Sequence, residues 1–177
     1  MTSLSAQAIR IAPATGAEQI GFVRELFLDY ARSLQIDLAF QDFEQELAAL
    51  PGKYAAPRGA LLLAWVGDAP AGCIAMRGLE LAEHPNACEM KRLYARPAFR
   101  GLGLGKRLAL ALLDAARSAG YAAMLLDTLA EMRSARSVYH ELGFVEIARY
   151  YDNPLPGARY LKLDLRRGNS AESGASD

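Results

Sequence analysis

Three glycines at alternate positions, Gly101, Gly103 and Gly105, lie where a strand-like segment gives way to a helical one. Residues 88–95 before them read as a strand, and residues 103–119 after them carry an apolar stripe at helical spacing. Glycine lets the backbone approach a ligand closely, and the first turn of a helix presents N–H groups that have no intrahelical partner. The turn therefore predicts a site for a phosphate group.

The kind of phosphate site follows from the residues around these glycines. A P-loop would need glycine where Arg100 stands and serine or threonine where Arg107 stands. A dinucleotide fingerprint would need a small residue at Lys106 or at Leu108. Both motifs fail, and the pattern that fits is Arg-x-x-Gly-x-Gly, ending at Gly105.

In the remaining segments, apolar residues recur either at the spacing of a helix or at that of a strand. Apolar residues recur at helical spacing from Ile20 to Leu34, and a Gly-Asp-Ala-Pro turn at 67–70 predicts a hairpin. Strands are expected at residues 8–12, 60–66, 71–77, 88–95, 121–128, 144–148 and 159–165, and three further helices at residues 41–50, 103–119 and 131–142. A mixed sheet with helices on both faces accounts for this order.

Size and charge indicate one domain and exclude several partners. The chain has 177 residues, of which 1–167 are expected to form one domain and 168–177 a disordered polar tail. Twenty basic residues balance twenty acidic ones, so nucleic acid and membrane are not indicated. The chain shows no signal peptide and no apolar run of about 20 residues, and we therefore expect a cytoplasmic location.

Cysteine and histidine are too sparse for a metal or triad site. Cys73 and Cys88 have no metal-ligand spacing and are expected to be buried free thiols. The two histidines, His84 and His140, are remote in sequence. No metal is expected.

Three linked segments resemble the GNAT superfamily of acyl-CoA-dependent N-acetyltransferases. They are Leu-Tyr-Ala-Arg-Pro at 93–97, the turn at 100–105, and Ala-Arg-Ser-Val-Tyr at 135–139 followed by Gly-Phe. Their order and separations agree with the family. The resemblance implies a single-domain α/β GNAT fold with a mixed, mostly antiparallel twisted sheet of about seven strands and four flanking helices, whose central parallel strands splay apart.

The resemblance also implies acetyl-CoA as co-substrate. Its diphosphate would lie on the glycine turn, and its pantetheine arm would pair with the fourth strand, where a bulge would aim an N–H at the thioester carbonyl. The implied cofactor-binding residues are Leu93, Tyr94, Ala95, Arg100, Gly101, Leu102, Gly103, Leu104, Gly105, Lys106 and Thr128. The family often has asparagine where this chain has Met132, so the asparagine contact with pantetheine is not expected at this position.

Two residues are the implied catalytic groups. Strand alternation places Glu89, Lys91 and Leu93 on one face, from which Glu89 would remove a proton from the amine; the alternative for Glu89 is an ion pair with a neighbouring cation. Tyr139 would protonate the departing thiolate; its alternative is a core aromatic residue.

The acceptor is less defined by sequence. The loop at 150–157 would wall a pocket or be ordinary surface, and Arg77, Arg92 and Lys53 are candidates for binding a carboxylate. We expect acetyl transfer to the primary amine of a small molecule, for which an amino-acid-like amine is one candidate, with a homodimer suggested by the family. The alternatives are a protein or peptide acetyltransferase and a non-catalytic acyl-CoA-binding module.

Overall fold

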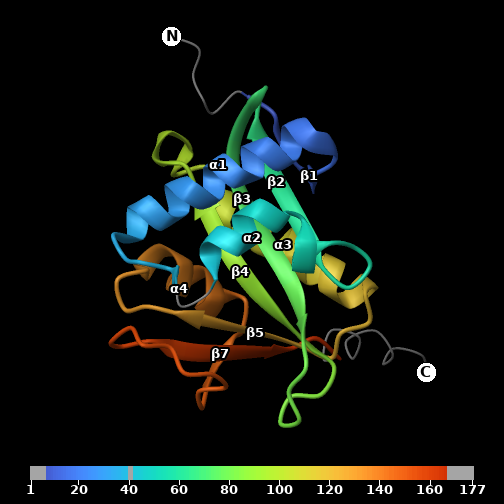
Figure 1. Cartoon of the computed structure of the whole chain (residues 1–177), viewed down its shortest axis with the longest axis vertical. Helices are drawn as coiled ribbons and strands as arrows, with labels where there is room; N and C mark the ends of the chain where they lie inside the picture. Colours follow the sequence, from blue (N-terminus) through green and yellow to red (C-terminus); the bar gives the residue numbers. More distant parts are fainter. Residues whose placement is uncertain (1–6, 40–41, 167–177) are drawn as a thin grey trace, which may run out of the picture.

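The fold is a seven-stranded mixed sheet with helices on both faces (Figure 1). The computed structural model describes residues 7–39 and 42–166. The strands follow the order β1-β2-β3-β4-β5-β7-β6, and among the described residues only the β4–β5 pair is parallel. Their bounds are β1 Ile9–Pro13, β2 Ala60–Val66, β3 Ala69–Leu79, β4 Ala87–Ala95, β5 Ala123–Thr128, β6 Val145–Ile147 and β7 Arg159–Asp164.

Four α-helices cover the sheet, as the sequence predicts. They are α1 Gly16–Leu34, α2 Phe43–Ala49, α3 Leu104–Ser118 and α4 Arg133–Glu141. α1 and α2 lie over one face, with Val23, Leu26 and Phe27 of α1 fully buried against Leu63 and Ala75 of the sheet. α3 and α4 lie over the other face (Figure 1). Each face therefore has its own apolar core.

The two central strands part after a short pairing. β4 and β5 share a register only from Ala87 to Glu89 on β4 and from Ala123 to Leu125 on β5. Beyond those residues the strands diverge toward their carboxyl ends, which confirms the predicted splay. In an open sheet with parallel strands, this end is where ligands bind.

A bulge in β4 changes one prediction about side-chain direction. The register jumps from Ala75↔Lys91 to Cys73↔Tyr94, and Arg92 adopts a φ of 62°. An extra residue in one strand reverses the alternation that follows it. Lys91 faces α1 and α2, on the same side of the sheet as Glu89, whereas Leu93 packs on the α3 side. The expectation that all three share one face is therefore wrong for Leu93.

Most expected bounds agree with the observed elements to within two residues. β3 begins at Ala69, because the hairpin turn consists of Gly67, with a φ of 60°, and Asp68 alone. Cys73 and Cys88 are buried free thiols, as expected. The proposed tail at 168–177 and the start of the second helix at 41 lie outside the described residues. No described helix is long and apolar enough to cross a membrane.

Candidate active site

A cavity of about 520 Å³ opens between the diverging ends of β4 and β5. Its walls come from the end of α1 and the segment after it, β4, the glycine turn, the first residues of α3, the end of β5, α4 and the loop before β7. The predicted cofactor-binding residues all line it except Leu102, whose side chain packs toward the α3-side core. Segments far apart in the sequence thus meet in one site.

The glycine turn has the geometry of an anion site. Gly101 and Gly103 have φ values of 86° and 72°, a region that side chains disfavour. A Cβ at Gly105 would meet no atom within 4 Å, so the space above the first turn of α3 is open. Gly103 caps α3 without a side-chain hydrogen bond, and the first intrahelical bond runs from the Arg107 N–H to the Gly103 carbonyl. The amides before Arg107 are therefore available to an anion.

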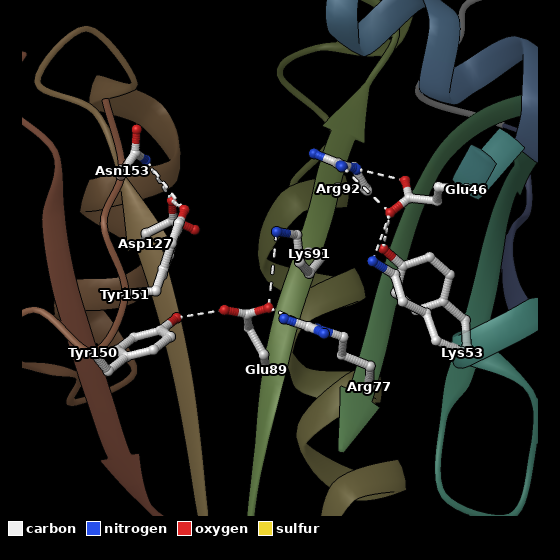
Figure 2. A network of polar contacts seen from close by, with 11 residues as sticks. Glu46, Lys53, Arg77, Glu89, Lys91, Arg92, Asp127, Tyr150, Tyr151 and Asn153 are labelled. Carbon is white, nitrogen blue, oxygen red and sulfur yellow. Dashed lines mark hydrogen bonds and ion pairs between the residues drawn. The ribbon is translucent and has the colours of Figure 1, made fainter. Parts of the chain in front are cut away.

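Arg92 at the bulge is fixed by a buried carboxylate. Its Nε lies 2.9 Å from Glu46 Oε2 and its Nη2 lies 3.3 Å from Glu46 Oε1 (Figure 2). The Tyr54 hydroxyl donates to the same Oε1 at 2.5 Å, and Lys53 lies 3.2 Å away. Burial alone would raise the pKa of Glu46, but the hydrogen bonds and charge of Arg92, with Tyr54 and Lys53, lower that pKa. This network joins α2 to the bulge.

Glu89 forms the ion pair that the sequence left open as its alternative role. Its Oε1 lies 3.0 Å from Arg77 Nε and 3.8 Å from Lys91 Nζ, and its Oε2 accepts a 2.6 Å hydrogen bond from the Tyr150 hydroxyl (Figure 2). Glu89 is 1% exposed and is not among the residues that line the cavity. Burial alone would raise the pKa of Glu89, but Lys91, Arg77 and Tyr150 together lower it.

Tyr139 lines the cavity from α4. Its ring packs against Phe144 with centroids 5.7 Å apart, and its hydroxyl makes no hydrogen bond within the described part of the chain. Burial, with smaller effects from Tyr30 and Asp127, raises the pKa of Tyr139, so the phenol keeps its proton at neutral pH.

Met132 is the N-cap of α4 and also lines the cavity. Its sulfur accepts a 3.6 Å hydrogen bond from the Thr128 hydroxyl, which is buried at the end of β5. A thioether is a weak acceptor and donates nothing, so this position supplies no amide contact.

Sequence reasoning missed Asp127, which lines the cavity at the end of β5. Its Oδ2 accepts a short hydrogen bond from the Tyr151 hydroxyl and a 2.9 Å bond from Asn153 Nδ2 (Figure 2). The available signal was its charge, because Asp127 is the one ionisable carboxyl in the apolar run 121–128. The loop at 150–157 therefore contributes to the cavity wall through Asn153 and Leu155.

The three cations suggested for a carboxylate already have acidic partners. Arg77 pairs with Glu89, whereas Arg92 and Lys53 pair with Glu46. None of the three is thus available to an acceptor without breaking an internal pair. Across residues 7–39 and 42–166, no group of three potential metal ligands occurs.

Relatives with similar sequences are N-acetyltransferases. One from Schizosaccharomyces pombe, uncharacterized, is 37% identical over 143 residues, which cover 80% of this chain and 86% of that protein. Another uncharacterized one, from Dictyostelium discoideum, is 30% identical, with 84% of this chain and 96% of that protein covered. The N-acetylaspartate synthetase of Danio rerio is 27% identical over 76% of this chain, which spans 48% of that protein.

The fold and site thus define an acetyl-CoA-dependent N-acetyltransferase. The model of the Acetyltransferase (GNAT) family matches residues 20–144, and the chain belongs to that family.

Solved structures show the same fold. A GNAT-family acetyltransferase from Staphylococcus aureus Mu50 has a TM-score of 0.69 at 22% identity, covering 90% of this chain and 100% of that one. YncA from Salmonella typhimurium, solved with its cofactor acetyl-CoA, has a TM-score of 0.69 at 19% identity, and the match covers 96% of this chain and 98% of that one. Acetyl-CoA is therefore bound by a protein of this fold.

Proposed function

We propose that the protein transfers the acetyl group of acetyl-CoA directly to the primary amine of a small, amino-acid-like acceptor. The observation that supports this best is that one cavity joins the open amides at the start of α3 to the Tyr139 hydroxyl. The N-acetylaspartate synthetases among the relatives, whose product is an acetylated amino acid by name, support the acceptor class.

In this proposal the diphosphate of coenzyme A accepts hydrogen bonds from the amides of residues 102–106, with Arg100 and Lys106 nearby. The pantetheine arm runs between β4 and β5 along the backbone of Leu93 and Ala95, with Tyr94 and Thr128 alongside. An N–H of the β4 bulge faces the thioester carbonyl and stabilises the oxyanion that forms on attack.

Tyr139 is the proposed acid. After the amine has lost one proton to a base, its nitrogen bonds to the acetyl carbon, the C–S bond breaks, and the thiolate takes the phenolic proton. The nitrogen then gives its remaining extra proton to the phenolate, which restores the phenol and leaves the neutral amide. Burial disfavours a thiolate as it disfavours a phenolate, so the raised pKa of Tyr139 does not prevent this transfer. The base role of Glu89 stays a prediction, and the contacts of Glu89 favour its alternative as an ion-paired residue.

Purified protein mixed with acetyl-CoA, pooled amines and a thiol-reactive dye tests the proposal. We expect thiol release with amino acids or other small amines. Release with peptides alone would favour a protein acetyltransferase, and binding of acetyl-CoA without turnover would favour a non-catalytic module. A cytoplasmic location and a homodimer stay predictions from the sequence.

A further inference from the structure

Two charged side chains of opposite sign project into the cavity from its two central strands. Lys91 extends from β4 toward Asp127 and Tyr151 across the space between β4 and β5 (Figure 2). Asp127 acts electrostatically on Lys91, since its charge counteracts part of the fall in the pKa of Lys91 that burial causes. Because both groups line the same cavity, one small molecule can contact both of them.

Asp127 has one oxygen fixed and the other open. Tyr151 and Asn153 both donate to Oδ2, which holds the carboxylate in one orientation. Oδ1 accepts no hydrogen bond from any residue in the described ranges. Since no fully buried side-chain oxygen or nitrogen in these ranges lacks a partner, Oδ1 must be accessible from the cavity or from solvent. A carboxylate can accept several hydrogen bonds, so Oδ1 is available to an ammonium group in the cavity.

Lys91 is the matching cation. Its side chain is 7% exposed, and its nearest acidic atom is Glu89 Oε1 at 3.8 Å, which Arg77 already approaches to 3.0 Å. Its ammonium makes no hydrogen bond within residues 7–39 and 42–166. A buried ammonium has three donors to satisfy, and a carboxylate of the acceptor would satisfy them.

We infer that Lys91 and Asp127 bind the acceptor as a zwitterion. Lys91 holds the carboxylate of the acceptor, and Asp127 Oδ1 accepts a hydrogen bond from its ammonium group. One proton then moves from that nitrogen to Oδ1, which frees the nitrogen lone pair to attack the acetyl carbon. The inference rests on the proposed function and adds to it the residues that select an amino acid.

The first experiment compares matched acceptors on the full-length protein. Thiol release from acetyl-CoA is measured with the common amino acids, with their carboxamides, and with the amines that lack the carboxylate. We expect kcat/KM for the best amino acid to exceed that for its carboxamide at least about tenfold, since a charge-assisted hydrogen bond is worth about that factor. Equal values for the acid and the carboxamide would overturn the inference.

The Lys91→Met variant tests the carboxylate contact. It should lose at least about tenfold in kcat/KM with the amino acid and little with the carboxamide, because only the acid contacts Lys91. A purely structural lysine would instead lower both rates in parallel, and that result would contradict the assignment. The control is Lys162→Met, a half-buried lysine on β7 that is not among the cavity-lining residues and should leave both rates unchanged.

The Asp127→Asn variant tests the ammonium contact and the proton transfer. Its kcat/KM should fall about a hundredfold at pH 7 and recover as the pH approaches about 10, where a free alkylamine loses its proton without help. An equal loss at every pH would mean that Asp127 is not the proton acceptor. Asp114→Asn on the exposed face of α3 is the matched control.

Calorimetry with acetyl-CoA separates this inference from the proposed function. Both variants should bind acetyl-CoA as the wild type does, which also shows that they fold. If the wild type binds acetyl-CoA but acetylates no amino acid, the zwitterion inference fails and the cofactor site stands. If the wild type binds no acetyl-CoA, the proposed function fails first.

Discussion

At the scale of single residues, the left-handed backbone of Arg92 decides on which side of the sheet the neighbouring side chains lie. Because the bulge adds one residue to β4, Lys91 and Arg92 lie on the same side of the sheet, toward α1 and α2. Arg92 is neutralised by Glu46, whereas Lys91 shares Glu89 with Arg77. Both residues line the cavity, but Arg92 is held by its pair with Glu46, so Lys91 is the cation that we propose contacts the acceptor.

Tyr139 provides the most direct residue-scale prediction. Tyr139→Phe should bind acetyl-CoA with an unchanged Kd and turn over at least about tenfold more slowly, since only the proton donor is lost. Steady-state rates and calorimetry measure the two effects. Tyr121→Phe is the control, because its hydroxyl donates to the Arg58 carbonyl away from the cavity. Unchanged turnover in Tyr139→Phe would remove the acid role.

Glu46 predicts a pH-dependent stability. Its folded pKa lies below the ordinary 4.5, so ionised Glu46 stabilises the fold above about that pH, and this stability is lost as the pH falls through the lower folded value. Glu46→Gln should lower the free energy of unfolding by about 3 kcal/mol at pH 7 and by less toward pH 3. Urea unfolding across this range measures the difference, with the exposed Glu44→Gln as control. A constant difference at all pH values would contradict the account.

At the scale of elements, the glycine turn and α3 are coupled. Gly101 and Gly103 are needed for their positive φ values, whereas Gly105 has an ordinary helical backbone and open space where a side chain would lie. Fold alone therefore does not explain Gly105. The proposed approach of the diphosphate to the start of α3 would explain it.

Gly105→Ala should thus separate stability from binding. Alanine favours a helix, so the melting temperature should not fall, whereas the added methyl group should raise the Kd for coenzyme A at least about tenfold. Thermal unfolding and calorimetry test the two parts. Gly21→Ala in α1, also without a contact at its Cβ, is the matched control and should leave binding unchanged. An unaltered Kd in Gly105→Ala would place the diphosphate elsewhere.

The sequence predicted the helices and strands better than it predicted the contacts between their side chains. Periodicity located all four helices and all seven strands, because each buries a regular apolar face. The bulge was anticipated only through the resemblance, and its effect on Leu93 was missed, because Arg92 is not a residue type that favours a positive φ. The pairing of Glu46 with Arg92 joins residues 46 positions apart, and no local pattern encodes such a contact.

At the scale of the whole molecule, the proposed cofactor site is a gap in the sheet. β4 and β5 are paired over three residues and then separate, and the proposed pantetheine arm would lie between them. A ligand that binds the folded state alone stabilises it by about 2.7 kcal/mol at a hundred times its Kd.

Coenzyme A at that concentration should therefore raise the melting temperature by about 5–10 °C, given about 2–4 °C per kcal/mol for a chain of this size. Pantetheine at the same concentration should raise it much less, since it lacks the diphosphate. Differential scanning calorimetry measures both shifts. Equal shifts would mean that the glycine turn contributes nothing to binding.

A crystal structure of the protein with coenzyme A tests the central claim most directly. The account predicts diphosphate oxygens about 2.7–3.2 Å from the amides at the start of α3, and the thiol between β4 and β5 near Tyr139. A diphosphate bound away from that turn, or a thiol outside the gap, would contradict the account.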